Sequence, residues 1–112
     1  MKVNGKEIKW QDPPKGDFWT DVKVHVLWQD ERTGANLTLL RAPKSDKAVM
    51  GPHAHPNANE WSIYLAGEVE AADGTRTTVS ADNTIFGFVP KGEIHATGGG
   101  KVIRELTWIR YH

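Results

Sequence analysis

The chain has 112 residues, with 14 basic and 14 acidic side chains, a formal net charge of zero and no cysteine. This length predicts a single domain, and the balanced charge gives no electrostatic reason to bind nucleic acid or a membrane surface. The lack of cysteine excludes disulfides, iron–sulfur clusters, thiolate zinc sites and cysteine nucleophiles. The polar start lacks the apolar core of a signal peptide, and no apolar run reaches the ~20 residues of a membrane-spanning helix, so we expect a cytoplasmic protein.

Short β-strands are predicted along most of the chain. The opening segment, which contains Pro13, Pro14 and Gly16, is expected to be irregular. Alternating or β-branched runs bounded by turn-forming residues then recur at short intervals, and no helical period lasts longer than a turn. Asp73-Gly74 predicts a hairpin with a type I′ turn. In chain order, the predicted strands cover 21–28, 36–42, 48–55, 60–66, 68–72, 75–79, 84–89, 95–97 and 101–111.

This pattern favours an all-β domain. About eight to ten short strands separated by glycine and proline turns are typical of a sandwich or a barrel. Closure into a barrel would also remove the exposed strand edges that a small all-β chain has to protect. We find no internal repeat and no domain boundary in the sequence.

Four side chains are candidate metal ligands: His53, His55, Glu60 and His95. Neutral imidazole and carboxylate groups bind divalent first-row metals. His53 and His55 are two residues apart, and because strand side chains alternate, they project from one face of an extended segment. Glu60 lies on the next predicted strand, and His95 follows a Pro90-Lys91-Gly92 turn. The four groups can therefore meet only if several strands curve around a common interior.

The same residues resemble the first of the two motifs of the cupin superfamily. That motif reads glycine, five residues, His-x-His, three or four residues, glutamate, six residues and glycine. His53, His55, Glu60 and Gly67 match it. Lys47 stands where the motif opens with glycine.

The second cupin motif reads glycine, five residues, Pro-x-Gly, two residues, histidine, three residues and asparagine. Pro90, Gly92 and His95 match it, whereas Thr84 replaces the glycine and Gly99 replaces the asparagine. All three departures fall at positions that shape turns, so they leave the ligand set unchanged. Both motifs occur in order on a β-pattern sequence, which makes the resemblance specific.

The resemblance implies one cupin domain over residues 1–112, folded as a single β-barrel (a jelly roll, or double-stranded β-helix), with metal-binding motifs at 47–67 and 84–99. It also implies one divalent transition metal on His53, His55, Glu60 and His95. Fe²⁺ is the favoured ion, and Mn²⁺, Ni²⁺, Zn²⁺ or Cu²⁺ are alternatives that the same ligands accept. The spacing and the leucine-rich lead-in are most similar to ChrR-like and acetylacetone-dioxygenase-like barrels.

Such a site favours chemistry on a small chelating molecule. Three imidazoles and a carboxylate leave open positions on a six-coordinate metal, where an oxygen-rich substrate can bind. We therefore expect a dioxygenase-type oxidoreductase. A metal-dependent isomerase or lyase acting on a sugar or polyol is one alternative, and a non-catalytic metal-binding or small-ligand-binding barrel is another. Glu60, as ligand or base, and Tyr64, as a phenol near the substrate, are the expected catalytic residues.

Side-chain parity extends these predictions. If Glu60 points inward, Ser62, Tyr64 and Ala66 should point inward too. Trp61, Ile63 and Leu65 should then form an apolar outer face, which favours a homodimer. The balanced charge predicts no nucleic-acid or membrane partner. In the strand at 84–89, either Ile85, Gly87 and Val89 or Phe86 and Phe88 should line the cavity.

The remaining titratable side chains are given structural interpretations. His25 is expected to be a structural or surface histidine on its strand. His112 is assigned no role, and Arg104 and Arg110 are interpreted as solvated charges on one face of the last strand. The glycine triplet 98–100 is interpreted as a turn, because no strand and helix flank it as a phosphate-binding loop requires.

Overall fold

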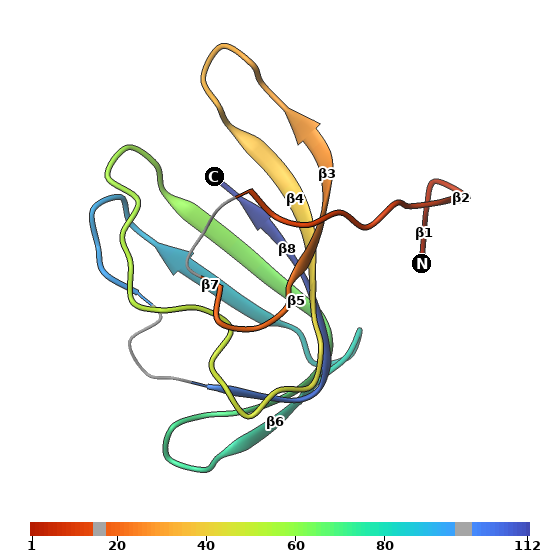
Figure 1. Cartoon of the computed structure of the whole chain (residues 1–112), viewed down its shortest axis with the longest axis vertical. Helices are drawn as coiled ribbons and strands as arrows, with labels where there is room; N and C mark the ends of the chain where they lie inside the picture. Colours follow the sequence, from red (N-terminus) through yellow and green to blue (C-terminus); the bar gives the residue numbers. More distant parts are fainter. Residues whose placement is uncertain (15–17, 96–99) are drawn as a thin grey trace.

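The computed structural model describes residues 1–14, 18–95 and 100–112. Within these ranges the chain is built from strands without a helix, and so it has no helix of the length and apolarity that a membrane crossing needs. A two-stranded hairpin precedes a six-stranded antiparallel sheet (Figure 1). The strands are β1 (Lys2–Val3), β2 (Lys6–Glu7), β3 (Lys23–Gln29), β4 (Asn36–Ala42), β5 (Glu60–Glu70), β6 (Arg76–Val79), β7 (Ile85–Val89) and β8 (Lys101–Tyr111).

The long strands β5 and β8 form the centre of the sheet. The order is β3-β4-β8-β5-β6, and β7 also pairs with β5. One edge of β5 pairs with β8, while its other edge pairs with β7 over Glu60–Tyr64 and with β6 over Gly67–Glu70. Figure 1 shows the strongly curved sheet that results. β5 therefore brings its own first residues, β7 and β8 together at one end of the molecule.

The core lies on one face of this sheet. Alternate residues of β4 and β8 supply much of it, as the strand period of two requires. Burying side chains of this size stabilises the fold by roughly 1.5–3 kcal/mol each. The buried cluster contains Val22, Val24, Leu40, Ala42, Val79, Val102, Leu106 and Trp108.

Several strand predictions are confirmed, and the all-β class is confirmed with them. β4 and β8 have the predicted bounds. The predicted strands at 60–66 and 68–72 are instead one strand, β5, which continues through Gly67 at a φ of 129°. A Cβ at Gly67 would lie 2.6 Å from the carbonyl oxygen of Glu105, so only glycine fits this close approach. The β5–β8 register shifts here, and Ala66 is exposed, so its predicted inward position is wrong.

The predicted strand at 48–55 is wrong. This stretch makes only isolated bridges, between Phe18 and Met50 and between His53 and His95. Gly51-Pro52 interrupts the run, and proline has no N–H for a ladder hydrogen bond. The short strand predicted at 95–97 falls outside the described residues beyond His95, as do Gly98 and Gly99 of the triplet 98–100.

The two tight hairpins also differ from expectation. The opening segment was expected to be irregular, but β1 and β2 pair around Asn4 and Gly5, which have φ angles of 53° and 78°. Asn-Gly is a strong hairpin signal. The hairpin at Asp73-Gly74 is confirmed, but its turn is not type I′. The N–H of Gly74 donates to the carbonyl of Ala71 over 2.9 Å, and neither central residue of that turn has a positive φ.

Candidate metal centre

Two connections between strands are joined side by side at the candidate site. The N–H of His53 donates to the carbonyl of His95 over 3.2 Å, and the N–H of His95 donates back over 2.9 Å. A third bond runs from the N–H of Gly92 to the carbonyl of His55 over 2.7 Å. These backbone bonds bring the His-x-His segment against the segment that carries His95.

The Pro90-Lys91-Gly92 turn sets the direction of the segment that carries His95. The N–H of Glu93 donates to the carbonyl of Pro90 over 3.1 Å, and Gly92 has a φ of 81°. A type II turn needs a positive φ at its third residue, which explains glycine there. The side chain of Asn59 accepts a hydrogen bond from the N–H of Lys91 over 2.9 Å, so the loop before β5 also holds this turn.

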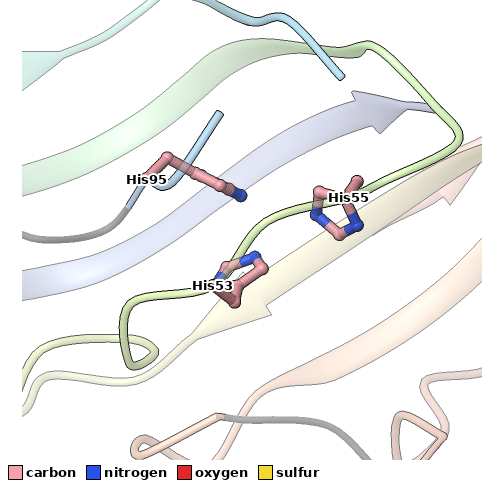
Figure 2. A group of neighbouring side chains, drawn as sticks. All are labelled: His53, His55 and His95. Carbon is pink, nitrogen blue, oxygen red and sulfur yellow. The ribbon is translucent and has the colours of Figure 1, made fainter. Parts of the chain in front are cut away.

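The rings of His53, His55 and His95 face one another. Their centroids lie 4.9 Å apart for His53–His55, 4.0 Å for His53–His95 and 5.4 Å for His55–His95. Each ring offers one nitrogen within 4.8 Å of the nitrogens offered by the other two. Figure 2 shows the three rings around a common space.

These histidines fit a divalent first-row metal. The Nε2 atoms of His53, His55 and His95 are buried and have no hydrogen-bond partner among the described residues. The Nδ1–H of His53 donates to the carbonyl of Gly51 over 2.8 Å, which leaves the lone pair on Nε2 free for a metal. Burial lowers the pKa of His55 and of His95, so both rings are neutral near pH 7, as metal ligands must be.

Glu60, the first residue of β5, stands beside these rings. Its side chain is only 9% exposed. One carboxylate oxygen lies 3.3 Å from Nε2 of His55, within ion-pair distance but without hydrogen-bond geometry, and the other lies 3.7 Å from Nδ1 of His95. The structure thus brings together the four side chains that the sequence nominated. Glu60 is nevertheless not part of the three-histidine group, because it groups instead with His55 and His112.

His112, which was assigned no role, lies beside Glu60 and His55. Its Nε2 lies 3.8 Å from the Glu60 carboxylate, and its ring centroid lies 4.6 Å from that of His55. Asn36 and His112 exchange backbone hydrogen bonds of 2.7 and 3.1 Å, which continue the β4–β8 ladder past Tyr111. Burial, with the nearby charge of Arg110, lowers the pKa of His112 to about 4. Parity with Trp108 and Arg110 was the signal that could have found this residue.

Arg110 also differs from its predicted state. Its side chain is 18% exposed, and its Nε lies 4.0 Å from the Glu60 carboxylate, so it is not a solvated charge. Burial lowers the pKa of this guanidinium. Arg104 is 59% exposed, as expected, and donates a hydrogen bond to the carbonyl of Gly67 over 3.2 Å. The two arginines lie on either side of the register shifts near Gly67, and only Arg110 reaches the interior.

A cavity of about 370 Å³ adjoins Glu60 and His95. This volume is in the range of small-molecule sites. Ser62 and Tyr64 line it as predicted, and the Tyr64 ring stacks on Trp108 with centroids 5.7 Å apart. Burial raises the pKa of Tyr64, so its phenol keeps its proton and can donate it in a hydrogen bond. The lining residues are Phe18, Ala48, Val49, Met50, Glu60, Ser62, Tyr64, Val69, Val79, Ile85, His95, Gly100, Leu106, Trp108 and Arg110.

The outer sides of the same strands are apolar and exposed. Ile85 lines the cavity, whereas Phe86 and Phe88 are 64% and 42% exposed, which decides between the two faces of β7. Trp61 and Ile63 are exposed on β5, as parity predicted. His25 is a structural histidine, as expected, because its Nδ1–H donates to the carbonyl of Lys9 over 3.1 Å.

No family model matches the sequence, and no curated protein matches it. Solved structures do match. An acetylacetone dioxygenase from Acinetobacter johnsonii has a TM-score of 0.63 and 15% identity, over 99% of this chain and 75% of that one. KdgF from a Halomonas species has a TM-score of 0.61 and 13% identity, over 97% and 90%. The polyketide cyclase RemF from Streptomyces resistomycificus has a TM-score of 0.58 and 18% identity, over 99% and 77%.

These structural matches run over nearly the whole chain, and other matching structures carry the descriptions cupin-2 domain and RmlC-like cupin. At such identities the likeness establishes the fold. The chain therefore has the fold of the cupin superfamily.

Proposed function

We propose that this protein is a metal-dependent cupin of the dioxygenase type, with one divalent metal on His53, His55, Glu60 and His95. The observation that carries the proposal is the set of three buried imidazole Nε2 atoms, without partners among the described residues, that face one another beside a cavity. The likeness to an acetylacetone dioxygenase supports the choice of reaction and of Fe²⁺ as the favoured ion. The substrate is a small oxygen-rich molecule that chelates the metal.

The protein side chains have distinct tasks in this proposal. A bound divalent metal would supply Lewis acidity to a chelating substrate and, as iron(II), reactivity toward O₂. Glu60 completes the ligand set or takes a proton from the substrate as a base. Tyr64 donates a hydrogen bond to a substrate oxygen from within the cavity. Apolar neighbours such as Ile85 and Leu106 exclude water, which strengthens the electrostatic contacts inside.

Oxygen consumption tests the reaction type. The protein is loaded anaerobically with Fe²⁺, its iron content is measured, and O₂ uptake is followed with a panel of small diketones. We expect uptake that depends on both iron and substrate, and a lower rate in Tyr64→Phe, which loses the donor and keeps the ring. Tyr111→Phe is the matched control, because Tyr111 is exposed at the end of β8.

An isomerase or lyase acting on a sugar or polyol is the second candidate function. The observation that favours it is the acid–base arrangement of Glu60 and the protonated Tyr64 in one cavity, which needs no redox-active metal. Turnover of a polyol with Zn²⁺ or Mn²⁺ in the absence of O₂ would replace the dioxygenase proposal with this one. Metal binding without any turnover would leave the protein as a non-catalytic binding barrel.

We also propose that the protein is a homodimer through its outer sheet face. Tyr111, Trp61 and Phe88 lie directly opposite one another across β8, β5 and β7, with ring centroids 5.6 and 5.1 Å apart along the row. Exposed apolar patches of this kind mark interaction sites. Light scattering should give twice the 12.5 kDa of one chain. A monomer at high concentration would refute the dimer.

A matched pair of substitutions locates the interface. Phe86→Asp, on the outer face, should shift the equilibrium to the monomer. Ile94→Asp should leave it unchanged, because Ile94 lies on the turn before His95 and has the same exposed fraction, 64%.

A further inference from the structure

Arg110 is a buried cation whose charge the described site leaves poorly compensated. Its side chain points to the cavity from β8, beside Tyr64 and Glu60. Its Nε is buried and has no hydrogen-bond partner among the described residues. The Glu60 carboxylate, 4.0 Å away, is its one acidic neighbour within ion-pair distance in the described ranges.

The Glu60 carboxylate is not available to Arg110 alone. The same carboxylate lies within 4 Å of His55, His95 and His112. A divalent metal and Arg110 together bring three positive charges, and Glu60 neutralises one of them. Two positive charges then remain in a site where burial makes unpaired charge costly.

An anionic ligand would reduce this imbalance by one charge for each carboxylate it carries, and the chemistry of arginine narrows the class of that ligand. The planar guanidinium presents a fork of N–H donors that matches the two oxygens of a carboxylate. A neutral diketone offers the metal two oxygens but gives the guanidinium no charge to pair with. A molecule with a carboxylate beside a keto or hydroxyl oxygen offers both.

We propose that Arg110 is a specificity-determining residue that makes the cavity select small 2-oxo or 2-hydroxy carboxylates over neutral chelators. This inference rests on the proposed function, because it places the metal and Arg110 on the same substrate. It adds the class of substrate, an organic acid, and assigns its recognition to a residue outside the two cupin motifs.

Binding to the zinc-loaded protein tests the inference without turnover. Pyruvate and diacetyl are matched probes, since diacetyl replaces the carboxylate of pyruvate with an acetyl group. Dissociation constants are measured by calorimetry for the wild type and for Arg110→Met, which removes the charge but keeps an unbranched chain. A charge-assisted hydrogen bond corresponds to about tenfold to a hundredfold in affinity. We expect a loss of that size for pyruvate in Arg110→Met, and no change for diacetyl.

Two further variants serve as controls. Arg110→Lys keeps the charge but not the fork, so its loss for pyruvate should be intermediate. Arg104→Met removes an exposed arginine from the same strand and should change neither affinity. An unchanged pyruvate affinity in Arg110→Met, or an equal loss in Arg104→Met, would overturn the inference.

Wild-type protein provides a measurement that does not depend on how the variants fold. In ¹⁵N-labelled, zinc-loaded protein, the side-chain Nε–H resonance of Arg110 should shift on addition of pyruvate and stay in place with diacetyl. If zinc is bound stoichiometrically and this resonance does not shift with pyruvate, the inference is refuted but the proposed function is not. A wild type that retains no zinc refutes the proposed function, and the inference with it.

Discussion

The candidate site is assembled from two kinds of backbone. His53, His55 and His95 lie on connections between strands, whereas Glu60 and Arg110 lie on β5 and β8 and His112 directly follows β8. The connections supply imidazole nitrogen atoms, and the strands supply the Glu60 and Arg110 side chains and the cavity wall. In the proposed site the connections therefore supply the three imidazole ligands, whereas the strands supply Glu60 and the side chains that decide what binds beside the metal.

The largest expected effect comes from breaking the connection side. His53→Ala and His95→Ala should each abolish stoichiometric metal binding, because each removes one of three converging imidazoles. The barrel should still fold, since the buried cluster lies on the sheet and contains neither residue. Elemental analysis after gel filtration gives the metal content, and circular dichroism checks the fold. His25→Ala, which removes a histidine that bonds to Lys9 and is not part of the cluster, should retain the metal.

Full metal retention in both His53→Ala and His95→Ala would remove the basis of the proposed metal site. Unfolding of either variant without metal would show instead that the connections stabilise the barrel, and this division between connections and strands would then be wrong.

A smaller effect is expected on the strand side, at Glu60. Glu60→Gln keeps the shape of the side chain and removes its charge beside His55 and Arg110. We expect metal affinity or turnover to fall by about tenfold to a hundredfold, the usual cost for a group that supports a metal site, while some metal stays bound. Metal titration with a competing chelator measures the change. Unchanged affinity and rate would make Glu60 a bystander.

The smallest effect is expected at His112. His112→Phe keeps an aromatic ring next to His55 but removes the nitrogen that faces Glu60. Metal affinity should fall by about tenfold, at the lower end of the cost of losing a supporting group. The same chelator titration measures it, with Tyr111→Phe as the control from the exposed face. A complete loss of metal would make His112 a metal ligand. The imidazole ligands would then not all come from the connections between strands.

The sequence predicted the fold class and the meeting of His53, His55 and His95, because both depend on local patterns. Strand period, turn residues and fixed motif spacing are visible within a few residues of one another. The pairing of β6 and β7 along one edge of β5 depends on long-range register, which no local pattern specifies. The bulges around Gly67 likewise changed which side chains face inward.

Arg110 and His112 were missed for a different reason. Both share the parity of the buried Leu106 and Trp108, so the strand pattern placed them on the interior face. The charge of Arg110 favoured a solvated position, and the place of His112 at the end of the sequence favoured no role, so neither was assigned to the site. Arg104 shares this parity but is exposed beside the register shift, so parity is a useful guide only where the strand pairing is regular.

The reciprocal hydrogen bonds between His53 and His95 have a consequence for protein engineering. These bonds fix the position of each segment along the other. A single-residue insertion in either segment would therefore displace the imidazoles of both. The His-x-His segment and the turn at Pro90-Lys91-Gly92 thus form one cassette. Anyone grafting this centre onto another scaffold has to transplant both halves together.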